Sequence, residues 1–185
     1  TYELGWKFQY GRVSGTLAAF MMDYTDKIRY VLDTTDDRYY ARNMDKYQTS
    51  GVEWNFAFQV HDYVKLSFGG YGADPWEEED DERTQAGPKW QAVPGIYFDN
   101  GKLKLGLNAT ILMERERGLD DYVNVHLTGS YQLTNWMKLK LKVDNLFDED
   151  LAVYGNMTPG YSSPYEVLDP GMWIYAGLEF DISLL

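Results

Sequence analysis

The sequence predicts an all-β protein, an antiparallel up-and-down segment of a transmembrane β-barrel with about nine strands. Two observations lead to this prediction. Apolar and polar residues alternate with a period of two along most of the 185 residues, as in strands with one dry and one wet face. The connections between these segments alternate between tight turns and long polar loops, as they do in bacterial outer-membrane barrels.

Composition narrows the class of protein. Hydrophobic residues make up 44% of the chain, yet no run approaches the roughly 20 apolar residues of a transmembrane helix. Aromatic residues reach 16%, with 16 Tyr and 6 Trp, and these two residues favour membrane–water interfaces. The net charge of −12 argues against nucleic acid as a partner. The absence of cysteine excludes disulfides and thiolate metal sites.

Six segments alternate cleanly and three alternate less cleanly. In the clearest one, Met137, Leu139 and Leu141 oppose a set of lysines. The other clean strands are expected at about residues 3–10, 52–60, 102–113, 123–132 and 174–182. The weaker ones are expected at 14–32, 64–72 and 90–98. Residues 14–32 are apolar on both faces, and Pro94 interrupts the last segment.

The connections and the aromatic residues agree on one topology. Tight turns are expected at Gly11-Arg12, His61-Asp62, Asn100-Gly101 and Thr134-Asn135, where Asn-Gly is the strongest hairpin signal. Long polar loops are expected at 33–46, 74–88, 115–121 and 148–170. Aromatic residues gather at both strand ends, which indicates two interfacial girdles. Those near the tight turns or the chain end are Tyr10, Tyr63, Phe98, Trp136 and Phe180.

Membrane energetics orient the strands. A Lys or Arg on the lipid face at mid-bilayer costs about 2–4 kcal/mol, so the apolar face is expected to meet lipid and the polar face a wet lumen. Single-chain bacterial barrels have an even number of strands, and an odd count leaves unpaired edges. Nine strands therefore predict the tail of a larger barrel, starting outside the cell and ending in the periplasm.

Two other classes stay open at this point. A missed strand in 14–32 or 149–170 would give a complete ten-stranded barrel acting as an adhesin, porin or enzyme. A soluble ligand-binding β-sandwich or barrel is the other class, although outward apolar faces argue against it.

Several motifs resemble those of TonB-dependent outer-membrane receptors. Residues 2–7 (YELGWK) resemble a strand of that family, and residues 20–28 (FMMDYTDKI) are similar to its next strand. Residues 49–53 (TSGVE) and 143–150 (VDNLFDED) resemble two further motifs, in order along the chain. The chain departs from the family pattern at Leu151–Tyr154, where the tyrosine comes later, and at its end, which is not aromatic.

The resemblance implies a place for the whole chain. Residues 1–185 would be the C-terminal part of a receptor barrel of about 22 strands, with the plug domain and N-terminal strands outside this sequence. The implied function is TonB-coupled uptake of a large scarce nutrient, most often a ferric siderophore, with cobalamin, haem or glycans as alternatives. The implied location is the outer membrane of a Gram-negative bacterium, with lipid and lipopolysaccharide as neighbours and TonB reached through the absent plug.

The sequence predicts no enzyme, metal site or cofactor. His126 shares a strand face with Asn124 and Ser130, but a catalytic triad needs these groups in contact, so we interpret them as wall residues. His61 lies in a tight turn without a spaced metal-binding partner. The acidic run at residues 77–82 is interpreted as a solvated loop, with cation bridging to lipopolysaccharide as a hypothesis.

Loop residues are the candidates for ligand contact. Arg38, Tyr39, Tyr40 and Arg42 lie in the first long loop, and Trp76 lies in the second. Aromatic faces and guanidinium groups suit flat anionic ligands such as ferric siderophores. Girdle aromatics explain these residues equally well.

Overall fold

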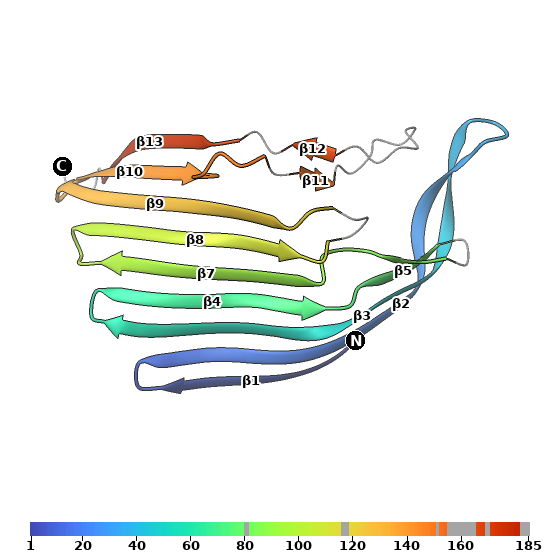
Figure 1. Cartoon of the computed structure of the whole chain (residues 1–185), viewed down its shortest axis with the longest axis horizontal. Coiled ribbons are helices and arrows are strands. Elements are labelled where there is room, and N and C mark those ends of the chain that lie inside the picture. The colour runs from blue at the N-terminus through green and yellow to red at the C-terminus, as the bar shows by residue number, and fades with distance from the viewer. Residues whose placement is uncertain (80–81, 116–118, 151, 155–165, 169–170, 182–185) are drawn as a thin grey trace.

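The computed structural model describes residues 1–79, 82–115, 119–150, 152–154, 166–168 and 171–181. Nine strands follow one another in a single antiparallel sheet, in the order β1-β2-β3-β4-β7-β8-β9-β10-β13 (Figure 1). The expected count of nine is therefore confirmed for this continuous path, while the described sheet has 11 strands because two short strands also pair into it. The strands are β1 (Tyr2–Tyr10), β2 (Val13–Asp33), β3 (Arg38–His61), β4 (Val64–Ala73), β7 (Trp90–Asp99), β8 (Leu103–Met113), β9 (Tyr122–Thr134), β10 (Met137–Asp144) and β13 (Trp173–Phe180).

The sheet is an open single layer over the described residues, with β1 at one edge and β13 at the other. None of the described residues belongs to a helix long and apolar enough to cross a membrane. Val143 is the one buried hydrophobic residue among them, whereas Leu4 is 80% exposed and Trp6 is 64% exposed. Over the described residues the sheet buries almost no apolar surface of its own, so its exposed apolar side chains must be covered by something outside it.

The strand register separates the sheet into two faces. One row crosses eight strands and contains only apolar side chains: Val13, Phe58, Leu66, Ile96, Leu107, Leu127, Val143 and Ile174. The next row lies on the opposite face, because side chains alternate along a strand. It contains Gln59, Lys65, Tyr97, Gly106, Thr128, Lys142 and Tyr175. We call these the apolar face and the polar face.

The tight turns all lie at the same end of the strands, on the left in Figure 1, as expected. Gly11 and Gly101 occupy turn positions with φ of 54° and 86°, where glycine is favoured. Two expected turns are wrong by one residue, and the turn expected at Asn100-Gly101 spans residues 100–102. β3 includes His61 and β9 includes Thr134, so the turns are Asp62-Tyr63 and Asn135-Trp136. A register shift beside each turn, at Gln59/His61 and Met137/Lys138, absorbs the extra residue.

The long connections contain more strand than expected. Residues 33–46 are not a loop, because β2 and β3 stay paired as far as Asp33 and Arg38 and leave a turn of residues 34–37. This hairpin projects beyond the other strands at the right of Figure 1. The expected loop 74–88 contains β5 (Trp76–Glu79) and β6 (Glu82–Gln85), and 148–170 contains β11 (Ala152–Tyr154) and β12 (Glu166–Leu168). Residues 116–118 of the fourth loop lie outside the described residues.

Two of the segments with weak alternation, residues 14–32 and 90–98, lie in the strands β2 and β7. In residues 14–32 the register, and not the alternation, separates the two faces. Ala18 pairs with Glu53 in a polar row, and Leu17 pairs with Trp54 in an apolar row. Pro94 lies inside β7, and the pairing between β7 and β8 passes from Ala92 directly to Gly95. Proline has no N–H to donate, so an interruption at this point is expected.

Candidate ligand-facing surface and family

Near the tight turns, the charged residues of the strands lie on the polar face. Lys104 donates to Asp99 at 2.7 Å, and Lys138 and Lys140 both contact Glu179. These ion pairs are half-exposed, so each contributes little stability. Their arrangement keeps charge on one face of the sheet, which requires water or a polar partner on that side.

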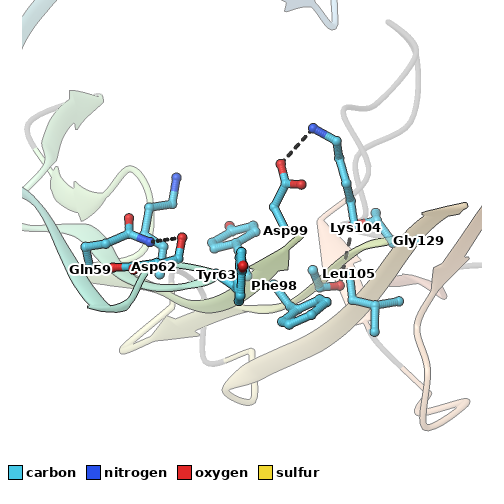
Figure 2. A pocket seen from close by; sticks show the side chains of 12 residues that line it. Gln59, Asp62, Tyr63, Phe98, Asp99, Lys104, Leu105 and Gly129 are labelled. Atoms are coloured by element: carbon cyan, nitrogen blue, oxygen red, sulfur yellow. Dashed lines mark hydrogen bonds and ion pairs between the residues drawn. The ribbon is translucent and has the colours of Figure 1, made fainter. Parts of the chain in front are cut away.

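A hollow of about 500 Å³ lies on this face beside the tight turns (Figure 2). Asp99 and Lys104 form an ion pair on one side of it, and Gln59 reaches the turn carbonyl groups on the other. The ammonium group of Lys65 lies 5.1 Å from the centre of the Tyr97 ring. The hollow is therefore polar and open, and its groups already contact one another.

His126 lies farther up the polar face, within a network that sequence reasoning did not identify. Its Nδ1 is 2.9 Å from Asp144 Oδ1, and its Nε2 is 3.5 Å from Thr110 Oγ1. Lys142 also contacts Asp144, at 2.5 Å. The contacts of His126 are therefore Thr110 and Asp144, not the Asn124 and Ser130 that share its face in sequence. A hydroxyl at 3.5 Å and a carboxylate shared with lysine are typical of a wall network rather than an activated nucleophile.

Asn145 connects the outer end of this wall to the next segment. Its backbone N–H donates to Asn124 Oδ1 at 3.1 Å, and its side-chain amide exchanges two hydrogen bonds with the backbone of Glu149. Asn145 is 2% exposed and has φ of 51°, a left-handed conformation that asparagine tolerates. The asparagine of the VDNLFD motif is therefore a structural brace, and Asn124 is its partner from β9.

Tyrosines mark the point where the β2–β3 hairpin leaves the sheet. Tyr24 pairs with Tyr47, and their ring centres are 6.1 Å apart. By alternation both continue the polar face, from Thr16 in β2 and Asn55 in β3. These two tyrosines therefore offer aromatic surface at the loop end of the polar face.

The structure does not bring the described members of the predicted ligand set together. Arg38, Tyr39 and Tyr40 lie at the far end of the hairpin, in β3 rather than in a loop. Trp76 pairs with Gln48, eight to ten residues farther along β3, which corresponds to about 26–33 Å along the strand. Arg42 also lies on β3, but its side chain is outside the described set.

The faces of the hairpin separate these residues further. Tyr39 and Tyr40 are consecutive in β3 and therefore point to opposite sides. The hydroxyl of Tyr40 donates to Asp36 at 2.5 Å, which raises the pKa of Tyr40. Lys89 lies 5.8 Å from the Trp76 ring centre. Tyr40 and Trp76 therefore already have polar partners within the chain.

The acidic run at residues 77–82 is distributed along the β5–β6 hairpin, except for residues 80–81, which are not described. Tyr47 pairs with Glu77, so this hairpin extends the sheet beside the projecting strands. Within the described part of the chain, no group of three His, Cys, Asp or Glu residues is arranged to hold a metal ion.

Comparison with known proteins identifies the family. A family model described as "TonB dependent receptor-like, beta-barrel" matches residues 1–146. The chain belongs to the TonB-dependent receptor family. Members of this family are receptors and transporters of the outer membrane of Gram-negative bacteria. A search of curated proteins found no match.

Solved structures of TonB-dependent receptors share this fold. The copper transporter OprC superposes with a TM-score of 0.76 at 19% identity, covering 96% of this chain and 30% of OprC. The ferric enterobactin receptor PfeA of Pseudomonas aeruginosa gives a TM-score of 0.72 at 20% identity, with 96% and 30% covered. The siderophore receptor PirA of the same organism gives 0.70 at 19% identity, with 96% and 28% covered. The chain spans less than a third of the length of these receptors.

Proposed function

We propose that these residues form part of the wall and mouth of an outer-membrane receptor for TonB-coupled uptake of a large scarce nutrient. The observation that supports this most strongly is the family match over residues 1–146. The separation of an uncharged apolar row from a lysine-bearing polar row also supports it, because a barrel wall has lipid on one side and a wet lumen on the other. The plug domain and N-terminal strands of this receptor would lie outside residues 1–185.

A ferric siderophore is our first candidate for the nutrient. The structures of PfeA and PirA are of siderophore receptors, whereas OprC is a copper transporter, so a metal-containing cargo is common to the three. Tyr24 and Tyr47 are the proposed contacts nearest the polar wall, since tyrosine offers both an aromatic face and a hydroxyl. Arg38, Tyr39, Tyr40, Arg42 and Trp76 stay proposed contacts of the outer segments.

The experiment is uptake of radiolabelled ferric siderophores by cells that depend on the full-length receptor. Alanine replacement of both Tyr24 and Tyr47 should lower binding of the transported siderophore by about fivefold or more, because two aromatic contacts contribute roughly 1–3 kcal/mol together. Replacement of both Tyr39 and Tyr40 tests the hairpin tip separately. Tyr10→Ala, beside a tight turn and outside the hollow, serves as the matched control and should leave binding unchanged.

Two outcomes would contradict the proposal. Receptor-dependent uptake that persists in cells lacking TonB would remove the energy coupling. If no ferric siderophore tested is taken up but another nutrient is taken up in a TonB-dependent way, the uptake function stands and the siderophore assignment is wrong.

A further inference from the structure

The apolar face is hollowed at the middle of the sheet by a groove of about 640 Å³. On the apolar face its lining contains the short side chains of Pro94 in β7 and Ala109 in β8, with larger residues such as Phe68 around them. Pro94 pairs with Phe68 on one side, and Ala109 pairs with Val125 of β9. The groove exists because two short side chains fall in neighbouring strands while longer ones stand on either side.

The groove lies at mid-span. Pro94 is the fifth of the ten residues of β7, and Ala109 is the seventh of the eleven residues of β8. The row Leu66, Ile96 and Leu107 forms its border toward the tight turns. In a membrane-spanning wall this depth corresponds to the hydrocarbon region and lies away from both headgroup layers.

The chemistry of the lining selects one kind of occupant. Among the described residues that line the groove, none has an ionisable side chain. Ile96 is 47% exposed and Phe58 is 43% exposed, so their apolar surface still has to be covered. The groove is continuous with the apolar rows on both sides, which are the surface that a barrel turns toward lipid.

We propose that this groove binds one acyl chain of an outer-membrane lipid as a retained ligand of the receptor. A hydrocarbon chain fills an apolar hollow with dispersion contacts that an empty hollow lacks. The short side chains leave room for the chain below the level of the surrounding aromatic rings, so it contacts more protein than lipids passing over a filled surface. This inference uses the membrane orientation of the proposed function and does not depend on the nutrient.

The test is lipid retention by the full-length receptor, purified from outer membranes and washed with detergent until lipid release stops. Native mass spectrometry then counts lipid molecules per receptor. The unsubstituted receptor should retain one. Ala109→Phe fills the groove and should lower retention by about tenfold or more, since each displaced methylene weakens burial about fourfold. Val125→Phe is a second filling variant with the same expected direction.

Ala176→Phe is the matched control. Ala176 pairs with Leu141, on the same apolar face but outside the groove, so this variant should retain lipid like the unsubstituted receptor. A diazirine-labelled phospholipid adds a measurement without any substitution, and it should crosslink to peptides containing residues 94–96 and 107–109.

Several outcomes would overturn the inference. Equal retention by Ala109→Phe and Ala176→Phe, a delipidated unsubstituted receptor, or crosslinks spread evenly over the apolar face would each exclude a retained chain. A lipid-free dimer in solution would assign the groove to a second copy. A receptor that fractionates outside the outer membrane would refute the proposed function as well, whereas loss of siderophore uptake with lipid retained would leave the groove assignment intact.

Discussion

At the scale of residues, two glutamines brace two of the tight turns in the same way. Gln59 Nε2 donates to the carbonyl oxygens of His61 at 2.8 Å and Val64 at 3.3 Å. Gln132 Nε2 contacts the carbonyl oxygens of Thr134 and Met137, again two and five residues ahead. Each glutamine lies beside a register shift, where the regular pattern of backbone hydrogen bonds is interrupted. Its side-chain amide therefore donates to backbone carbonyl groups next to the turn.

Removing one brace should destabilise its turn. Gln59→Leu keeps a side chain of similar size but loses the donors, and the expected loss in free energy of unfolding is about 1 kcal/mol. Urea unfolding of the detergent-solubilised receptor, followed by tryptophan fluorescence, measures it. Gln48→Leu provides the control at an exposed position of the same strand. An effect of Gln59→Leu no larger than that of the control would show that the turn does not need the brace.

The Tyr40 hydroxyl provides a pH-dependent prediction. Its hydrogen bond to Asp36 raises the pKa of Tyr40, with Asp36 as the largest cause. A raised pKa means that the bond stabilises the hairpin below the ordinary tyrosine range, and this contribution is lost as the pH rises through the folded pKa. Asp36→Asn should lower the pKa of Tyr40, and Asp37→Asn should not. NMR titration of ring-labelled tyrosine measures both, and an unchanged pKa in Asp36→Asn would contradict the bond.

At the scale of elements, close approach of strands constrains β4. A Cβ added at Gly70 would lie 2.2 Å from the carbonyl oxygen of Gln91 and 2.8 Å from the Trp54 ring. Trp54 and Gly70 are paired in the register, so the indole ring covers the glycine. Because one of the two contacts is with backbone, a rotamer change cannot relieve it. The glycine therefore fixes the spacing between β4 and β7 and the place of the Trp54 ring.

Gly70→Ala should therefore lower the free energy of unfolding by about 1–3 kcal/mol, as overpacking does elsewhere. Gly177→Ala is the matched control, because a Cβ at Gly177 meets nothing within 4 Å, and its effect should stay within about 0.5 kcal/mol. Urea unfolding measures both variants in detergent. Equal stabilities would mean that β4 and β7 separate easily at this point.

The elements also show how far sequence reasoning extends. Period-two alternation identified nine strands and their faces because lipid and water impose opposite demands on the two sides of a wall. The same alternation failed for residues 33–46 because Asp33 and Arg38 pair across this ladder, and a charged pair gives no apolar–polar alternation to detect. The brace between Asn145 and Asn124 depends on residues that lie far apart in sequence, and no local pattern contained it.

At the scale of the whole molecule, the alternation of connections agrees with the family assignment. Four tight turns lie at one end of the strands, and the β2–β3 and β5–β6 hairpins extend from the other end (Figure 1). The solved receptors superpose on 96% of the chain but are more than three times as long. Over the described residues, β1 and β13 each pair with a single neighbour in this sheet.

The most direct test of this account determines on which side of the outer membrane each end of the strands lies. Residues 1–185 contain no cysteine, so an introduced cysteine is the single labelling site in this part of the receptor. Thr35→Cys and Asn135→Cys are introduced separately into the full-length receptor, with any cysteine outside these residues replaced, and intact cells are treated with a membrane-impermeant maleimide. The account predicts that Thr35→Cys is labelled in intact cells and that Asn135→Cys is labelled only after the outer membrane is opened. Labelling of both positions in intact cells, or of Asn135→Cys alone, would contradict it.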